Sequence, residues 1–521
     1  MLIKKKIPYI ISFFIFAIPI LAFLNKINLP QVTALEVYLI SFSQFSFFII
    51  ILLLSYLIHS LFLKKKIEFK IFLLINSFIA FLLLFFQNIK SLLFFESKNF
   101  LFDEIFSFLI FVLAYLFLIK FAQKNFNLIC RFLIIFIFLQ FSLFIYNLII
   151  INANIDSQIT IENKENIASN LDSLSINENK DKANIFFIVF DGMMTLESAE
   201  KLKIIRNKDE TINSLKKNNI NYKENFLANY DSTYLSLASL LKGTYPVTEE
   251  SKKYRTRKNY FPFFLMDQKK DNDFFKILRK TNKKFFWLGN SNSSCLNNIY
   301  VDCVGENRNL KFISIVSLFY YDSVYIYLFN KILGQYDNRY ESIDFLVNPK
   351  KEFKGNEIYL LHILNPHPPY YLNKNCEIKN DLMKKLETDE MEVKYYGYAY
   401  NCLLNMAQVF TNKISKINEK NLIFIMGDHG WSFDKEIMEK NNLEKSDNRF
   451  KTFFAYKVPS SCKEISTPKS IVNTIRYALN CSENSNLNYL KDLQFKSFPE
   501  GHKDYGKVFL RKKNLIIKQE F

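Results

Sequence analysis

Five long apolar stretches near the start constrain the fold of this chain more than any other feature. Each is long enough to cross a bilayer, which takes about 20 residues of helix. They run from Ile7 to Leu24, Val37 to Leu63, Phe69 to Phe86, Ile105 to Phe121 and Phe132 to Ile151. The first is too long, and too poorly followed by small residues, to be a removable signal peptide. We expect a membrane domain of five helices over residues 1–152.

Clusters of Lys and Arg in the short loops predict the orientation of these spans. Positive charges favour the cytoplasmic side of a membrane. They lie before the first span, between the second and third, and between the fourth and fifth, at Lys4–Lys6, Lys64–Lys70 and Lys120–Arg131. With five spans, all three clusters fall on one side. This predicts a multi-pass protein of the cytoplasmic (inner) membrane with its N-terminus inside. Everything after Ile151 would be periplasmic or extracellular.

The cysteine positions agree with this topology. Cys130, at the cytoplasmic end of the fifth span, is expected to be a free thiol. The other six follow the spans: Cys295, Cys303, Cys376, Cys402, Cys462 and Cys481. An even number in an oxidising compartment favours disulfides. Among the possible connectivities we choose the pairing of neighbours, 295–303, 376–402 and 462–481. Metal binding is disfavoured because no Cys-x-x-Cys pair exists.

The net charge of +18 does not predict a nucleic-acid partner. The lysines are scattered among acidic and amide residues, without a basic helix or an aromatic-basic RNA motif. An AT-rich coding sequence would explain the excess of Lys, Asn, Ile and Phe. A bias toward anionic substrates or lipid headgroups stays open as the alternative.

Residues 153–182 are rich in Asn, Asp, Ser, Glu and Lys and are expected to form a polar linker. In residues 183–521, apolar runs typical of strands buried on both faces alternate with amphipathic helical segments. The runs are Asn184–Phe190, Lys284–Leu288, Glu357–His362 and Asn421–Met426, and the helical segments include Glu200–Asn218 and Tyr395–Ile417. The alternation predicts an extracytoplasmic α/β sandwich around a mostly parallel sheet.

Polar residues follow three of these strands, where ligands bind in parallel sheets. Asp191 follows the first strand, His367 the third, and Asp428-His429 the last. Thr233 lies in a loop that enters a helix at its N-terminus, a favourable place for an anion. Taken singly, each of these residues could instead be an ordinary turn residue or helix cap. Together they supply carboxylates, an imidazole and a hydroxyl, a ligand set that suits Zn²⁺ or Mn²⁺.

The order and spacing of these segments resemble the sulfatase-like branch of the alkaline phosphatase superfamily. Thr233-Tyr-Leu-Ser-Leu-Ala-Ser-Leu-Leu-Lys-Gly-Thr-Tyr-Pro246 is similar to its nucleophile helix, and Gly427-Asp-His-Gly430 to its late metal motif. A five-span anchor before such a domain resembles lipoteichoic acid synthases and lipid A phosphoethanolamine transferases. The resemblance covers roughly Lys182 to Lys457. It implies Thr233 as nucleophile, and one divalent metal, Zn²⁺ or Mn²⁺, with four ligands: Asp191, Thr233, Asp428 and His429.

The departures from the family pattern narrow the chemistry. Sulfatases carry an oxidisable residue in Cys/Ser-x-Pro-x-Arg, whereas residues 233–237 lack that residue, the proline and the arginine. Phosphate esters are therefore expected rather than sulfate esters. Asp191 stands where the lipid-phosphate transferases usually have Glu. No companion Asp for a second metal lies near His362 and His367. His367 is expected to contact the substrate phosphate or leaving group. His362, still on the strand, is expected to lie behind His367 in the same substrate pocket. His502 is a further substrate-binding candidate.

The resulting hypothesis is an enzyme that transfers a phospholipid headgroup, phosphoglycerol or phosphoethanolamine, through a phospho-threonine. The donor would be a membrane phospholipid and the acceptor a surface glycan or lipopolysaccharide. If water replaces the acceptor, the enzyme is a phosphodiesterase or other ester hydrolase. A different class is a transport component with a non-catalytic external domain. That class predicts polar residues facing one another in the spans, and apart from His59 these are nearly absent.

Overall fold

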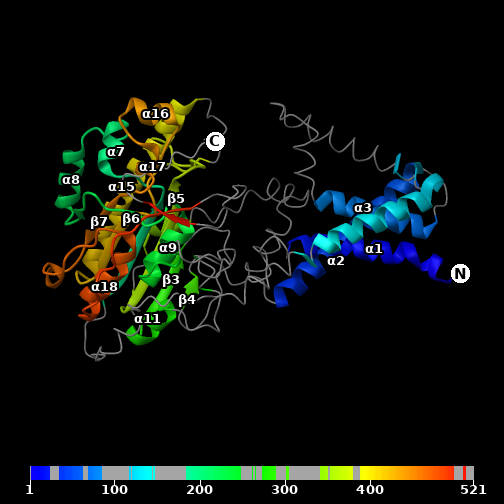
Figure 1. The fold of residues 1–521 in the computed structure, drawn as a ribbon, viewed down its shortest axis with the longest axis horizontal. Coiled ribbons are helices and arrows are strands. Elements are labelled where there is room, and N and C mark those ends of the chain that lie inside the picture. Colours follow the sequence, from blue (N-terminus) through cyan, green and yellow to red (C-terminus); the bar gives the residue numbers. More distant parts are fainter. Residues whose placement is uncertain are drawn as a thin grey trace. The chain divides into compact units, whose positions relative to one another are not determined.

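The computed structural model describes residues 2–23, 34–62, 68–84, 117–118, 120–121, 123–143, 145–146, 183–247, 261, 265, 273–288, 301–303, 341–349, 353–379, 388–497 and 508–511. The chain divides into two compact units, each treated by itself (Figure 1). One contains the N-terminal helices and the other an α/β fold. The predicted boundaries at residues 152 and 182, the linker between them and His502 lie outside the described residues.

The helical unit is built from α1 (Leu2–Phe23), α2 (Ala34–Phe62), α3 (Phe69–Leu84) and a helix over Gln123–Leu143. Among the described residues, two segments are long and apolar enough to cross a membrane, Ile40–Leu57 and Gln123–Leu143, and only 22% and 11% of their residues are buried within the protein. A core helix of a soluble protein would bury far more of its apolar surface. These two helices therefore have the exposure expected of membrane spans.

Three of the five predicted stretches correspond to α1, α2 and α3, although the apolar segments of α1 and α3 are shorter than a full span. The fourth stretch lies mostly outside the described residues, so the count of five spans stays a prediction. The helix described over Gln123–Leu143 includes the predicted start of the last span, Phe132, and extends before it. The polar residues before Phe132 continue the helix because backbone hydrogen bonds, not apolar side chains, propagate it.

The α/β unit contains a seven-stranded sheet in the order β2-β7-β6-β1-β5-β3-β4 and a separate two-stranded sheet. The strands are β1 (Ile185–Asp191), β2 (Asn221–Tyr222), β3 (Lys284–Leu288), β4 (Val301–Cys303), β5 (Glu357–Pro366), β6 (Leu422–Gly427), β7 (Phe454–Lys457), β8 (Phe495–Ser497) and β9 (Val508–Leu510). The five strands from β6 to β4 pair in parallel, whereas β7 is antiparallel to β6 and to β2. The sheet is therefore mixed, with an antiparallel edge.

Helices connect the strands and cover the sheet. They are α7 (Leu196–Lys201), α8 (Lys208–Lys217), α9 (Thr233–Lys242), α11 (Asp273–Thr281), α14 (Glu341–Val347), α15 (Asp389–Ile417), α16 (Lys435–Lys440), α17 (Lys445–Asn448), α18 (Thr474–Glu483), and the 3-10 helices η7 (Ser460–Cys462) and η8 (Ile471–Asn473). The helix predicted over Glu200–Asn218 is two helices, α7 and α8. They separate because Lys203 has a φ of 58° and Asn207 caps α8.

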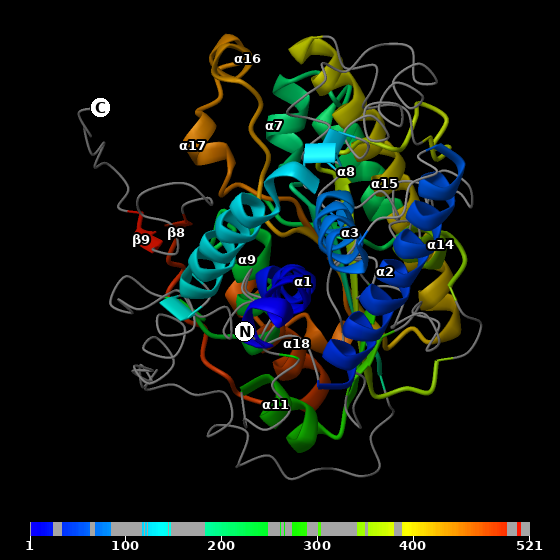
Figure 2. The same cartoon turned by 90° about the vertical axis from the view of Figure 1, so that its right-hand side faces the viewer.

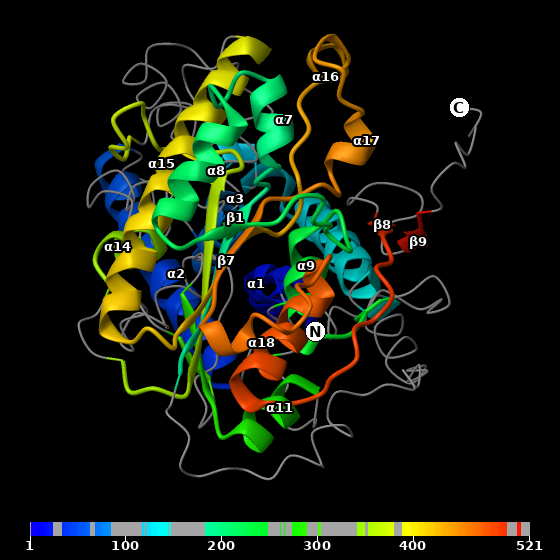
Figure 3. The same cartoon turned by 90° about the vertical axis from the view of Figure 1, so that its left-hand side faces the viewer.

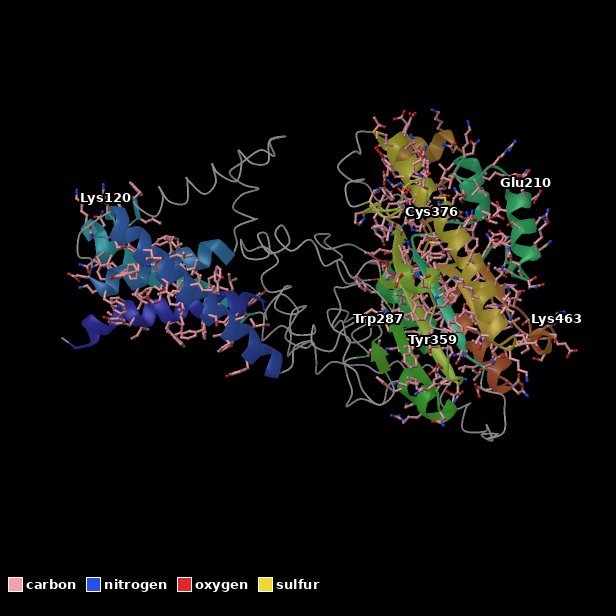
Figure 4. The ribbon with its side chains drawn as sticks, turned by 180° about the vertical axis from the view of Figure 1, so that it is seen from behind. Lys120, Glu210, Trp287, Tyr359, Cys376 and Lys463 are labelled. Atoms are coloured by element: carbon pink, nitrogen blue, oxygen red, sulfur yellow. A yellow bond between two sulfur atoms is a disulfide. The ribbon has the colours of Figure 1, made fainter. Side chains whose placement is uncertain are left out.

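The alternation of side chains along β1 divides the core into two layers. Phe186, Ile188 and Phe190 pack toward α14 and α15, whereas the alternate residues of β1 pack toward α9, α11 and α18. Figure 3 shows these two groups of helices on opposite sides of the sheet, and Figure 2 shows the same arrangement from the other direction. In Figure 4, Tyr359 of β5 marks the first layer, where its ring stacks on Phe186.

The described residues of the α/β unit contain two disulfides. They join Cys376 to Cys402 and Cys462 to Cys481, as the pairing of neighbours predicted. The first ties the segment after β5 to α15, where Cys376 is labelled in Figure 4. The third predicted pair, 295–303, lies outside the described side chains. Cys130 of the helical unit is a free, buried thiol, as expected.

Candidate active site

Three neighbouring strands end at the same edge of the sheet and bring the predicted polar residues together. Asp191 is the last residue of β1, and Asp428 directly follows β6, which pairs with β1 in parallel. On the other side of β1, Asp191 is level with Pro366, the last residue of β5. Parallel strands that share a register place their carboxyl ends side by side, so residues far apart in the sequence meet here.

The loop after β6 fixes the carboxylate of Asp428. Its Oδ1 accepts hydrogen bonds from the backbone amides of Gly192 and His429, both at 2.8 Å. Gly192 has a φ of 70°, and a Cβ built there would lie 3.1 Å from the Trp431 ring. The Asp-Gly pair at the end of β1 therefore does more than form a turn. The amide of Gly192 orients the carboxylate of Asp428, which follows the neighbouring strand β6. The other oxygen of Asp428, Oδ2, is buried without a hydrogen-bond partner.

Asp191, Asp428 and His429 form a buried cluster whose ligand atoms lie within 4.8 Å of one another. Asp191 Oδ1 also has no hydrogen-bond partner. His429 Nε2 is 3.6 Å from Asp191 Oδ1 and 3.5 Å from Asp428 Oδ2. Buried carboxylate oxygens left in this state are costly unless a cation joins them.

The protonation of His429 strengthens the case for a cation. Its Nδ1 donates to the carbonyl oxygen of Gly430 at 2.9 Å, so Nε2 carries the lone pair of the neutral ring. Burial lowers the pKa of His429 to about 4, despite the opposing charge of Asp428. The unprotonated Nε2 of His429 therefore faces one oxygen of each carboxylate. Two carboxylates and one imidazole fit a divalent metal such as Zn²⁺ or Mn²⁺.

The two carboxylates have opposite pKa shifts. Burial raises the pKa of Asp191 well above its usual value, and the neighbouring charge of Asp428 raises it further. Burial also opposes ionisation of Asp428, but the interactions with His429 and His362 outweigh it and lower the pKa. Two carboxylates this close cannot both ionise easily without a compensating charge.

Thr233 is the first residue of α9 and points its hydroxyl at this cluster. Its Oγ1 lies 3.4 Å from His429 Nε2, the ring nitrogen that faces Asp191 and Asp428. The preceding residue, Ser232, makes no side-chain capping bond, so the helix N-terminus is not closed by its own cap. A hydroxyl at an uncapped helix start is well placed to meet an anion.

His362 in β5 and His367 directly after it differ in their surroundings. The backbone amide of His367 donates to the Asp191 carbonyl at 3.0 Å, and its Nδ1 donates to the Pro368 carbonyl, which leaves Nε2 as an acceptor. Its ring meets the face of Trp431 with centroids 4.6 Å apart. His362 is buried in the strand, and its Nε2 has no hydrogen-bond partner. Burial lowers the pKa of both rings.

The sequence did not indicate two further residues of this site, Trp431 and Arg449. Trp431 follows the Gly427–Gly430 motif and packs against Gly192 and His367. Arg449 lies over the Trp431 ring, 5.4 Å from its centroid, and donates to the Asp231 carbonyl at 2.8 Å. The position of Trp431 beside the motif was a usable signal. Arg449 had none, because an arginine between a short helix and a strand has no characteristic spacing.

Comparison with solved structures finds similar folds. The C-terminal periplasmic domain of EptC from Escherichia coli is 11% identical with a TM-score of 0.38, covering 65% of this chain and 95% of that chain. The integral membrane lipooligosaccharide phosphoethanolamine transferase A from Neisseria meningitidis is 10% identical with a TM-score of 0.37, covering 92% and 95%. The phosphonate monoester hydrolase of Agrobacterium radiobacter is 9% identical with a TM-score of 0.36, covering 62% and 82%.

Phosphoethanolamine transferases are thus among the similar structures, as the sequence motifs predicted. No protein-family model and no curated protein matches the chain. Because the identities and TM-scores are low, the function proposed below rests on the residues of the site.

Proposed function

We propose that this protein is a membrane-anchored, metal-dependent enzyme that transfers a phospholipid headgroup, phosphoglycerol or phosphoethanolamine, through a covalent phospho-threonine. The observation that carries the proposal is the meeting of the Thr233 hydroxyl with the ligand atoms of Asp191, Asp428 and His429 at a helix N-terminus. A nucleophile, a cation site and an anion-binding helix end coincide there.

Asp191, Asp428 and His429 would hold one divalent metal, Zn²⁺ or Mn²⁺, beside the oxygen of Thr233. When bound, such a metal lowers the pKa of a neighbouring hydroxyl and draws charge from phosphoryl oxygens. The fit rests on the two carboxylate oxygens that have no hydrogen-bond partner among the described residues, and on the Nε2 lone pair, which lies 3.4 Å from Thr233 Oγ1.

In the first half-reaction, a bond forms between Thr233 Oγ1 and the phosphorus of the donor lipid. The bond from phosphorus to the diacylglycerol oxygen breaks, and that oxygen leaves with a proton. In the second, an acceptor hydroxyl loses its proton, bonds to phosphorus, and Thr233 Oγ1 leaves. We assign the proton exchange to His367, because its Nε2 is a neutral acceptor beside the cluster.

The membrane helices support the choice of a lipid donor. Ile40–Leu57 and Gln123–Leu143 would hold the chain at the bilayer surface, where headgroups are available. In the proposed topology five spans place the N-terminus inside and the α/β unit on the periplasmic or extracellular side. The acceptor would be a cell-envelope glycan or lipid. With water as acceptor the same site would be a hydrolase.

The test uses the full-length protein in lipid nanodiscs with headgroup-labelled phosphatidylethanolamine and phosphatidylglycerol. Wild type is compared with Thr233→Ala, Asp428→Asn and a matched control, Thr411→Ala, whose hydroxyl bonds within α15. We expect headgroup label on Thr233 in wild type and in the control. Thr233→Ala should carry no label, and Asp428→Asn should lose bound metal. Full turnover in Thr233→Ala, or unchanged metal content in Asp428→Asn, would sink the mechanism.

The acceptor is tested separately. Labelled phosphothreonine enzyme is offered lipopolysaccharide, a surface glycan, or buffer alone. Discharge that needs a glycan or lipid supports transfer, whereas equal discharge in buffer indicates a hydrolase.

A further inference from the structure

Arg449 is held at the site by three contacts that leave most of its guanidinium unused. Its backbone carbonyl accepts from the Gly430 amide at 2.9 Å, which ties it to the loop of His429. One guanidinium nitrogen donates to the carbonyl of Asp231, two residues before Thr233. The group also rests on the Trp431 ring. Arginine has five N–H donors, and among the described residues no further hydrogen bond or ion pair occupies them.

Arg511 gives a useful contrast within the same unit. It too lies over an aromatic ring, 5.0 Å from the centroid of Phe450. However, its guanidinium forms an ion pair with Asp447 at 2.5 Å and a hydrogen bond to Gln494 at 3.2 Å. Arg511 is therefore a neutralised, structural arginine. Arg449 has a similar ring contact but no carboxylate partner in the described part of the chain, although a half-buried arginine usually finds one.

The charge of Arg449 acts on the cluster around Thr233. Burial and the charge of Asp428 have the largest effects on the pKa values of Asp191 and His429. The charge of Arg449 comes next and lowers both pKa values. Two carboxylates balance a divalent metal, and His429 is neutral. Arg449 adds a permanent positive charge beside this cluster, and it also interacts electrostatically with the Asp231 carboxylate. One positive charge matches a phosphodiester, which carries one negative charge, better than a phosphate monoester, which approaches two at neutral pH.

We propose that the guanidinium of Arg449 binds a non-bridging oxygen of the substrate and makes the site selective for singly charged phosphodiesters, an inference that rests on the proposed role of Thr233. Arginine suits this task because its planar fork pairs with phosphate oxygens and its charge is permanent. The Asp231 and Trp431 contacts would orient the fork without neutralising it.

The experiment measures kcat/KM of full-length, metal-loaded protein for bis(4-nitrophenyl) phosphate, a diester, and 4-nitrophenyl phosphate, a monoester. The variants are Arg449→Met, Arg449→Gln and the matched control Arg511→Met. Losing one fixed donor to a phosphoryl oxygen typically lowers the rate about 100-fold. We expect a loss of this order for the diester in both Arg449 variants and a smaller loss for the monoester. Arg511→Met should keep the ratio of the two substrates at its wild-type value.

A binding readout separates a substrate contact from a merely structural role. In the Thr233→Ala background, bis(4-nitrophenyl) phosphate should raise the melting temperature, and adding Arg449→Met should abolish this shift while bound metal stays constant. Millimolar guanidinium should restore part of the diester activity that Arg449→Ala loses. If Arg511→Ala loses activity, guanidinium should not restore it.

Two outcomes would overturn the proposal: an unchanged diester-to-monoester ratio in both Arg449 variants, or an unchanged ligand-induced melting shift. If Arg449→Met fails to fold, Arg449→Gln decides by the same two measurements. Activity retained in Thr233→Ala would instead refute the proposed function. An inactive Thr233→Ala beside an unimpaired Arg449→Met would refute only the role of the arginine.

Discussion

The helical unit and the α/β unit place apolar side chains in opposite environments. Phe13, Tyr38 and Phe138 of the helical unit are 66%, 66% and 70% exposed, whereas every residue of β1 is buried. A surface covered with large apolar residues is favourable in contact with lipid. A protein surrounded by water instead buries such residues in a close-packed interior. The α/β unit in turn buries charged groups, and those that lack partners gather at the ends of β1 and β6. The helical unit therefore has a surface suited to lipid, whereas the α/β unit has an interior that encloses a polar site.

Removing the metal should produce the largest stability change, and only in the α/β unit. A ligand present at a thousandfold its Kd stabilises the folded state by about 4 kcal/mol. Both tryptophans, Trp287 and Trp431, belong to the α/β unit, so their fluorescence reports its unfolding alone. Chelation should lower the unfolding midpoint of wild type. Asp191→Asn should show no such shift, and an equal shift in that variant would refute the metal assignment.

The disulfides should give the next largest contrast. Cys376–Cys402 and Cys462–Cys481 close loops with sequence separations of 26 and 19 residues. Replacing either pair by serines should lower the free energy of unfolding by about 3 kcal/mol, because the unfolded chain regains freedom. Urea titration followed by tryptophan fluorescence measures the loss. Cys130→Ser, in the helical unit, is the control and should leave the midpoint unchanged.

A charge on an exposed apolar position should act differently in the two units. Phe138→Arg should disfavour membrane insertion by about 2.5–3.5 kcal/mol if that face contacts lipid. Val409→Arg, on the exposed face of α15 and 50% exposed, should change stability by less than about 0.5 kcal/mol. Membrane fractionation and thermal unfolding measure the two effects, and Phe138→Leu is the control. Normal insertion of Phe138→Arg would contradict the membrane assignment of this helix.

The pH dependence of the metal-free protein should have opposite signs for two residues of the cluster. The pKa of His429 is lowered to about 4, so between pH 4 and 6.5 the unfolded state binds its proton and stability rises with pH. The pKa of Asp191 is raised, so its contribution is lost as pH rises through the folded pKa. Each slope is at most about 1.4 kcal/mol per pH unit. His429→Gln and Asp191→Asn should remove slopes of opposite sign, and equal effects would refute the assigned shifts.

Several elements could be predicted from the sequence because their signals are local. The apolar runs before Asp191 and Asp428 predicted β1 and β6 to within one residue, and the run at Lys284–Leu288 predicted β3. The start of α15 was placed at Tyr395 instead of Asp389, because its first turn is acidic rather than apolar. The break between α7 and α8 was missed, because a positive φ at a lysine follows from packing and not from residue type.

The candidate site was only partly predictable. The polar residues at the ends of β1, β5 and β6 could be expected to meet, because parallel strands share their carboxyl edge. The orphaned oxygens of Asp191 and Asp428 could not be foreseen, and that of Asp428 depends on which oxygen the Gly192 amide selects. The contacts of Arg449 likewise require the loops of Asp231 and His429 to be in place.

The sequence by itself determined where the chain is apolar enough for lipid, which runs form strands, and which residue types can supply the chemistry. These properties depend on composition and on neighbours along the chain. Only the tertiary structure decided that the lone pair of His429 faces two carboxylates beside Thr233, and that Arg449 meets them without a carboxylate of its own. Burial and distance between remote residues set those charges, and neither is written in the local sequence.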